Sequence, residues 1–91
     1  MDKQKTVVRV GGKEYTLVSA DPPEYMHRVA AYVDRKLEEA AMSTRLPTNM
    51  VAVLTALNMA DDLMKSHDEN GRLRREIARL RQQLDEARVQ Q

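Results

Sequence analysis

The side chains that could act as acids, bases or metal ligands in this sequence are few and poorly spaced. His27 and His67 are its two histidines, cysteine is absent, and neither histidine has a second ligand at metal-motif spacing. His67 beside Asp68 could accept protons, but a solvated histidine on a helix surface is the simpler interpretation. Asp61 and Asp62 could form a carboxylate pair, but adjacent helix residues point about 100° apart. We therefore expect no enzyme activity, no metal site and no cofactor.

A ladder of apolar residues near the C-terminal end indicates a different chemistry, the association of helices. Its spacing of 4, 3, 4 and 3 is that of a coiled-coil seam at heptad positions a and d. The ladder consists of Leu73, Ile77, Leu80, Leu84 and Ala87. Asn70 extends it at position a, where a lone asparagine fixes register at some cost in stability. Because one chain cannot cover such a seam, the sequence predicts an oligomer.

Charged residues beside this seam bear on how two helices would pair. Position e is held by Arg74, Arg81 and Arg88, and position g begins with Glu76. In a parallel pair Glu76 meets Arg81 of the other chain, whereas an antiparallel pair places arginine against arginine. The pattern favours a parallel pair, although each exposed ion pair contributes only tenths of a kcal/mol. The alternative is a charged helix in solvent with a kink at residues 70–71.

The arginines of this segment also raise the possibility of a polyanionic partner. Residues 71–91 carry six arginines against three acidic residues, a local charge of +3. Arginine-rich helices can bind nucleic acid or acidic lipid. However, these arginines lie at positions c, e and f rather than in a basic block ahead of the ladder, and the whole chain carries only +1. We expect neither nucleic acid nor membrane as partner, and keep a nucleic-acid-binding coiled-coil oligomer as the alternative function.

Length and composition limit the size of any core. Ninety-one residues without phenylalanine or tryptophan suit one small domain plus an extension, stabilised by oligomerisation. No apolar run reaches the length of a membrane span, and the first residues lack the apolar stretch of a signal peptide. With no cysteine, these features favour the cytoplasm.

Residues 5–18 are predicted to form a β-hairpin. KTVVRV and EYTLV are rich in β-branched residues and flank Gly11-Gly12, a two-residue turn signal. No helix with Lys-Ser/Thr follows these glycines, which argues against a phosphate loop. A two-residue loop pairs Val10 with Lys13, Arg9 with Glu14, Val8 with Tyr15, Val7 with Thr16, and Thr6 with Leu17. Val8, Tyr15 and Leu17 should then face the core, and the hairpin must pack on a helix or another sheet.

Two helices are expected after the hairpin. The first covers about 22–42, with Asp21 as N-cap, Pro22 at the first helical position and Glu24 completing a capping box. The second starts at Thr48 or Asn49 and runs to the C-terminal end. Its first half has a wide apolar arc with one polar strip, which includes Thr55. The prediction is an α+β head of residues 1–66 and a coiled-coil stalk of residues 67–91.

The order of these elements resembles the ZapA family of cell division proteins. The most specific parts are Gly12-Lys13-Glu14-Tyr15, the run from Tyr32 through Asp34 to Lys36, and ALNMADDL in the second helix. The resemblance covers nearly the whole chain. The region between residues 23 and 56 varies in length in the family, and the stalk of this chain is rather short.

The resemblance implies a function that the composition does not. ZapA proteins bind FtsZ, the tubulin-like GTPase of the bacterial division ring, and cross-link its filaments at mid-cell. It implies a parallel dimer, with two dimers joined antiparallel through their stalks, and FtsZ contacts on charged head residues. By position Lys13 and Arg45 match basic residues of relatives, and Arg35 and Lys36 are weaker candidates. We therefore expect a non-enzymatic, cytoplasmic filament cross-linker.

Overall fold

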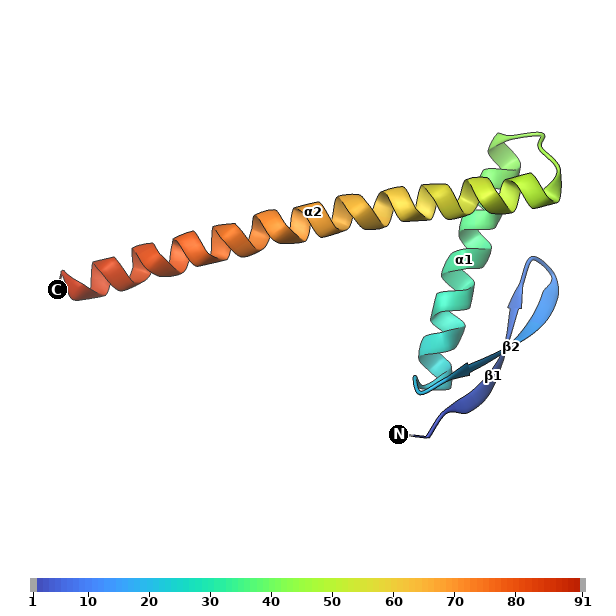
Figure 1. Cartoon of the computed structure of the whole chain (residues 1–91), viewed down its shortest axis with the longest axis horizontal. Coiled ribbons are helices and arrows are strands. Elements are labelled where there is room, and N and C mark those ends of the chain that lie inside the picture. Colours follow the sequence, from blue (N-terminus) through green and yellow to red (C-terminus); the bar gives the residue numbers. More distant parts are fainter. Residues whose placement is uncertain (1, 91) are drawn as a thin grey trace. The chain divides into compact units, whose positions relative to one another are not determined.

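Two strands and two helices make up the structure, a computed structural model that describes residues 2–90. In chain order these are β1 (Gln4–Val10), β2 (Lys13–Ser19), α1 (Pro23–Ser43) and α2 (Thr48–Val89) (Figure 1). The predicted α+β class, with a hairpin, a short helix and one long helix, is confirmed. Contacts divide the chain into two units, one ending at Leu57 and the other beginning at Asn58. The head and stalk limits, 1–66 and 67–91, stay a prediction.

The hairpin has the register expected of a two-residue loop. Val10 pairs with Lys13, and the antiparallel pairing continues without a bulge to Gln4 and Ser19. Gly11 and Gly12 have φ angles of 61° and 80°, a conformation that residues with a Cβ rarely adopt. These glycines therefore set the loop length, and the loop length sets which side chains share a face.

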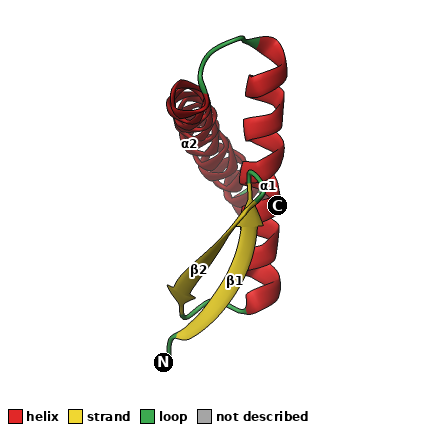
Figure 2. Cartoon of the chain, turned by 90° about the vertical axis from the view of Figure 1, so that its right-hand side faces the viewer, coloured by secondary structure: helices red, strands yellow, loops and turns green. Residues whose placement is uncertain are grey.

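One face of the hairpin packs against α1 through β1 (Figure 2). Val8 is buried there, as predicted, and Leu17 is partly buried. Tyr15 was expected in this core, but 50% of it is exposed, so this prediction is wrong for the single chain. It lies on β2, whereas the contacts with α1 come from β1. Thr6 is buried instead, and its hydroxyl has no hydrogen-bond partner among the described residues.

Helix α1 begins one residue later than the capping pattern indicated. Pro22 is the N-cap, and the helix has no side-chain cap hydrogen bond. The Asp21 side chain instead accepts a hydrogen bond of 3.1 Å from the Ser19 hydroxyl, and the Asp21 amide donates to the same hydroxyl. The predicted Asp21 cap is therefore wrong, because the turn that leaves β2 uses its carboxylate. The predicted end of the helix near Ser43 is confirmed.

Helix α2 runs through Asn70 and Gly71 without interruption, so no break in the helix marks these residues. Its predicted start at Thr48 is confirmed. The polar strip is wrong at one position, because Thr55 is buried and its hydroxyl donates to the Val51 carbonyl at 2.7 Å. This bond satisfies the hydroxyl within its own helix and lets a threonine occupy a buried position.

The apolar arc in the first half of α2 is largely exposed in the single chain. Met50, Val53 and Leu57 are 49%, 62% and 63% exposed, although Val51 between them is buried. Further along the helix, Leu63 and Met64 are exposed to similar degrees. Exposed large apolar side chains in this number are typical of a helix that associates with another chain.

Candidate partner-binding site

The hairpin turn displays Lys13 at the surface of the first unit. Lys13 begins β2, directly after the two glycines, and its side chain is exposed. An Arg9–Glu14 ion pair of 4.0 Å spans the strands beside it, and Arg9 also donates to the Gly12 carbonyl at 3.5 Å. These long contacts of the exposed Arg9 side chain hold the turn only weakly. The Lys13 side chain itself has no ion-pair partner among residues 2–90.

A stronger contact joins this turn to α1. The Gly11 amide donates to Oδ1 of Asp34 at 2.8 Å, across 23 positions of sequence. A carboxylate acceptor makes this a charge-assisted hydrogen bond at a favourable distance. Asp34 was part of the run that carried the family resemblance, but the sequence offered no sign of its partner, because the pairing depends on how the hairpin packs on α1.

A groove of about 610 Å³ lies beside the turn, within the first unit. Lys13 and Tyr15 line it from the hairpin, Asp34 lines it from α1, and Leu46 and Val51 line it where the chain enters α2. Arg45 directly precedes Leu46 and is exposed. The fold thus brings Lys13 and the neighbour of Arg45 to one groove, although they are far apart in the sequence.

The two weaker candidates, Arg35 and Lys36, do not line this groove. Their cationic groups lie 5.4 Å and 5.6 Å from the centre of the Tyr32 ring, within the range of cation–π contacts. Lys36 also pairs with Glu39 at 3.5 Å. Their charges are therefore partly engaged by α1 itself, in contrast to those of Lys13 and Arg45.

The expected oligomerisation seam is a continuous exposed stripe of α2. The exposures of Leu73, Ile77, Leu80 and Leu84 lie between 42% and 52%, as for large side chains on a helix without a partner. Asn70, at the preceding a position, is also exposed. The residues are correctly spaced for a seam, and nothing within the described chain covers them.

Acidic residues beside the seam already have partners within α2. Arg72 binds both carboxylate oxygens of Glu69, at 2.6 Å and 3.0 Å, and Arg79 binds Glu76 in the same way one heptad later. Hydrogen bonding to Arg72 lowers the pKa of the Glu69 carboxyl, and that to Glu76 raises the pKa of Arg79. An interchain bond from Glu76 to Arg81 would thus compete with an existing pair.

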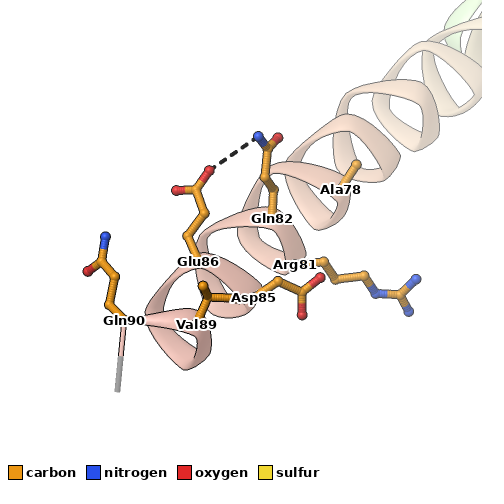
Figure 3. A pocket seen from close by; sticks show the side chains of 7 residues that line it. All are labelled: Ala78, Arg81, Gln82, Asp85, Glu86, Val89 and Gln90. Carbon is orange, nitrogen blue, oxygen red and sulfur yellow. Dashed lines mark hydrogen bonds between the residues drawn. The ribbon is translucent and has the colours of Figure 1, made fainter.

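The end of α2 offers no enclosed site. Figure 3 shows the side chains of residues 78–90 that border a shallow hollow; all but Gln90, which directly follows the helix, come from α2. Gln82 donates to Glu86 at 3.3 Å along its surface. One helix has no second wall, so this surface cannot enclose a ligand. Among residues 2–90 no cluster of three or more His, Cys, Asp or Glu side chains could hold a metal ion. No described helix combines the length and apolarity needed to cross a membrane.

Comparison with known proteins places the whole architecture in one family. The family model described as cell division protein ZapA matches residues 6–90. A cell division protein ZapA of Halalkalibacterium halodurans is 46% identical over 65 residues, covering 70% of this chain and 71% of the relative. That of Geobacillus kaustophilus is 38% identical over 76 residues, covering 82% and 84%.

A solved structure agrees with these sequence matches. The ZapA mutant dimer from Geobacillus stearothermophilus superposes with a TM-score of 0.68 at 36% identity, covering 85% of this chain and 91% of that one. The resemblance drawn from the turn, the first helix and the start of the second is confirmed. Hairpin, long helix and unpartnered seam therefore have one common explanation, which is that this chain belongs to the cell division protein ZapA family.

Proposed function

We propose that this protein binds FtsZ filaments and cross-links them, which promotes assembly of the bacterial division ring without catalysis. Membership of a cell division family supports the process. The observation that carries the mechanism is the exposed seam of α2, four large apolar residues at heptad spacing with no partner among residues 2–90. A protein that joins copies of itself through one segment, and displays a cationic turn on another, can connect two filaments.

Self-association comes first in this mechanism. Two chains pair in parallel through the seam and through the exposed apolar arc of α2, and two such dimers join through their stalks. The related structure is described as a dimer, which supports the first step. The assembly then has heads at both ends. Once one head binds a filament, the effective concentration of the other head near a second binding site is raised. Individually weak heads thereby bundle filaments reversibly.

The filament contact is assigned to the groove beside the hairpin turn. Lys13 lines this groove, and the exposed Arg45 is next to Leu46, which also lines it. Neither cation has an ion-pair partner among residues 2–90, so both suit an acidic surface. Arg35 and Lys36 are secondary candidates, because Tyr32 and Glu39 already engage their charges. The protein would act in the cytoplasm at mid-cell, which a fluorescent fusion imaged in dividing cells would test.

Sedimentation of polymerised FtsZ with and without this protein tests the function. We expect the protein to pellet with filaments and to increase the pelleted FtsZ, and not to shift double-stranded DNA under the same conditions. The converse result, a DNA shift without filament binding, would favour the nucleic-acid alternative.

A charge-reversal pair tests the contact. Lys13→Glu with Arg45→Glu should abolish most co-sedimentation while mass and melting temperature hold, because exposed substitutions usually change stability by about 0.5 kcal/mol or less. Lys3→Glu with Arg28→Glu is the matched control, with the same change in net charge elsewhere on the first unit. Full binding by the folded Lys13/Arg45 variant would move the contact to Arg35 and Lys36. Added salt should weaken wild-type binding, because exposed charges are screened over about 8–10 Å at physiological ionic strength.

A further inference from the structure

We infer that Asp34 is a positioning residue for the filament contact: it holds the hairpin turn against α1 and so fixes where Lys13 is presented. This inference rests on the proposed function, in which Lys13 meets an acidic filament surface. Asp34 itself contacts the turn rather than the partner. The inference gives a role to the Gly11–Asp34 hydrogen bond, which joins two segments that are distant in the sequence.

The geometry of the turn shows why an external anchor matters. Gly11 and Gly12 would meet no heavy atom within 4 Å if each carried a Cβ, so the surrounding structure does not confine them. Glycine backbones are also conformationally permissive. The neighbouring Arg9 contacts, at 3.5 Å and 4.0 Å, are long. The 2.8 Å bond from the Gly11 amide to Asp34 is therefore the firm link between the turn and a rigid helix.

A tether at this point acts on the adjacent cation. Lys13 is two residues from the Gly11 amide, and both Lys13 and Asp34 line the same groove. If the turn separates from α1, the Lys13 ammonium group samples a wider volume and pairs less often with a fixed acidic group. A turn that is already ordered in the free protein loses less conformational entropy when it binds, so binding to the filament is stronger.

Simple electrostatics predicts that loss of Asp34 changes filament binding in the opposite direction from the inference, so the two explanations can be distinguished. Removing a negative charge near Lys13 makes the surface more positive and should strengthen binding to an acidic filament. Removing the tether should weaken it. Glu38, one helical turn further along α1 and also lining the groove, provides the control, since its carboxylate has no bond to the turn.

The experiment compares the full-length chain with Asp34→Ala, Asp34→Asn and Glu38→Ala. Amide exchange at Gly11, measured by NMR, should accelerate about tenfold in Asp34→Ala, as expected for loss of a charge-assisted bond. Co-sedimentation with FtsZ filaments should weaken by a similar factor and depend less on salt. Asp34→Asn keeps an acceptor oxygen and should retain most of both properties, and Glu38→Ala should bind as well as wild type or better. Mass and melting temperature serve as folding controls.

Each other outcome overturns the inference at an identifiable step. Unchanged Gly11 exchange in Asp34→Ala would show that the carboxylate does not hold the turn. Faster exchange with full filament binding would show that turn order is irrelevant to the contact. Equal losses of filament binding in Asp34→Ala and Asp34→Asn, with Gly11 exchange accelerated only in Asp34→Ala, would show that binding does not follow the order of the turn. Full binding by the Lys13→Glu single variant would remove the turn from the contact, and a wild-type chain that does not sediment with filaments would overturn the proposed function itself.

Discussion

Replacing Ile77 with glutamate should break the association of the stalks while leaving each chain folded. Ile77 is the central a residue of the seam, with large apolar neighbours at Leu73 and Leu80. It is 49% exposed in the single chain. The α2 helix does not need this side chain to fold, because half of its surface faces solvent before any partner arrives. The substitution therefore acts chiefly on the associated state.

The size of the effect follows from these exposures. Full burial of a leucine or isoleucine side chain is worth about 1.5–3 kcal/mol, so covering the exposed half of Ile77 contributes about 1 kcal/mol per chain. Two chains lose about 2 kcal/mol. Two facing carboxylates add desolvation and repulsion of at least about 2 kcal/mol. The dissociation constant of the seam should rise by roughly three orders of magnitude.

Analytical ultracentrifugation over a concentration series measures this directly. Ala78→Glu is the matched control, because it adds the same charge one residue away, at solvent-facing position b with arginines one turn before and after. It should assemble like wild type. An unchanged assembly mass for folded Ile77→Glu would refute the seam, and equal loss in both variants would show that added charge, not position, is responsible. Because the first half of α2 has its own exposed apolar arc, we expect the mutant to retain dimers through the head.

Three further predictions concern stability. Thr6→Val should raise the free energy of unfolding by about 1 kcal/mol in a thermal melt, because it removes a buried hydroxyl without a partner; a lower melting temperature would mean that assembly satisfies this hydroxyl. Gly71→Ala should stabilise the helix by about 0.5–1 kcal/mol, since the added Cβ would meet only Arg75 Nη1 at 3.6 Å, and circular dichroism would record it. Arg72 lowers the pKa of Glu69 in the folded protein. The stabilisation that this pair gives the fold is therefore present above the ordinary glutamate pKa and is lost as pH falls through the lowered value. Acidification should therefore melt wild type more than Glu69→Gln, and equal sensitivity would exclude this pair as a contributor.

The elements that local chemistry determines could be predicted from the sequence. Two glycines between segments rich in β-branched residues favour a two-residue loop, and that loop length determines every residue pair of the hairpin. The start of α2 after Pro47 and its continuation to Val89 follow from helical periodicity alone. These predictions needed no knowledge of tertiary contacts.

Errors occurred where the local pattern allowed a side chain more than one environment. Asp21 matches a helix N-cap by type and position, yet in the observed turn its carboxylate accepts a hydrogen bond from the Ser19 hydroxyl. Thr55 belongs to a polar strip by its chemistry, yet a hydrogen bond to Val51 allows burial. Tyr15 shares a face with Val8, but only β1 approaches α1. A nearby serine side chain, a backbone carbonyl and the packing of the hairpin outweighed the local pattern in these three cases.

The candidate site also has features that the sequence could predict and features that depend on tertiary contacts. The resemblance to ZapA selected Lys13 and Arg45, and their positions in a turn and a linker predicted that both would be exposed. Their relation to one groove, and the Asp34 bond beneath the turn, depend on where the hairpin lies on α1. Family resemblance indicated that Asp34 belongs to a specific run, and only the folded structure indicates what its carboxylate contacts.

Asn70 bears on the stability of the predicted seam, and so on whether the proposed bundles would be reversible. The seam has four large apolar residues, and an asparagine occupies the a position before them. A polar residue at position a specifies register and number of strands at a cost in stability. If bundles must dissolve as the ring remodels, a seam of limited stability is suitable. When the stalk pairing is weak, fewer assemblies remain bound to two filaments at once.

Asn70→Val should therefore tighten assembly and make bundles more persistent. A β-branched apolar residue at position a favours two strands and adds buried area, so the dissociation constant should fall by about tenfold or more. Light scattering of preformed FtsZ bundles after dilution would then decay more slowly than with wild type, while single-head affinity stays unchanged. Leu84→Ala, which shortens the seam at its far end, should shift both measurements in the opposite direction. Tighter assembly with an unchanged decay rate would show that release from the filament, rather than stalk pairing, limits the lifetime of bundles.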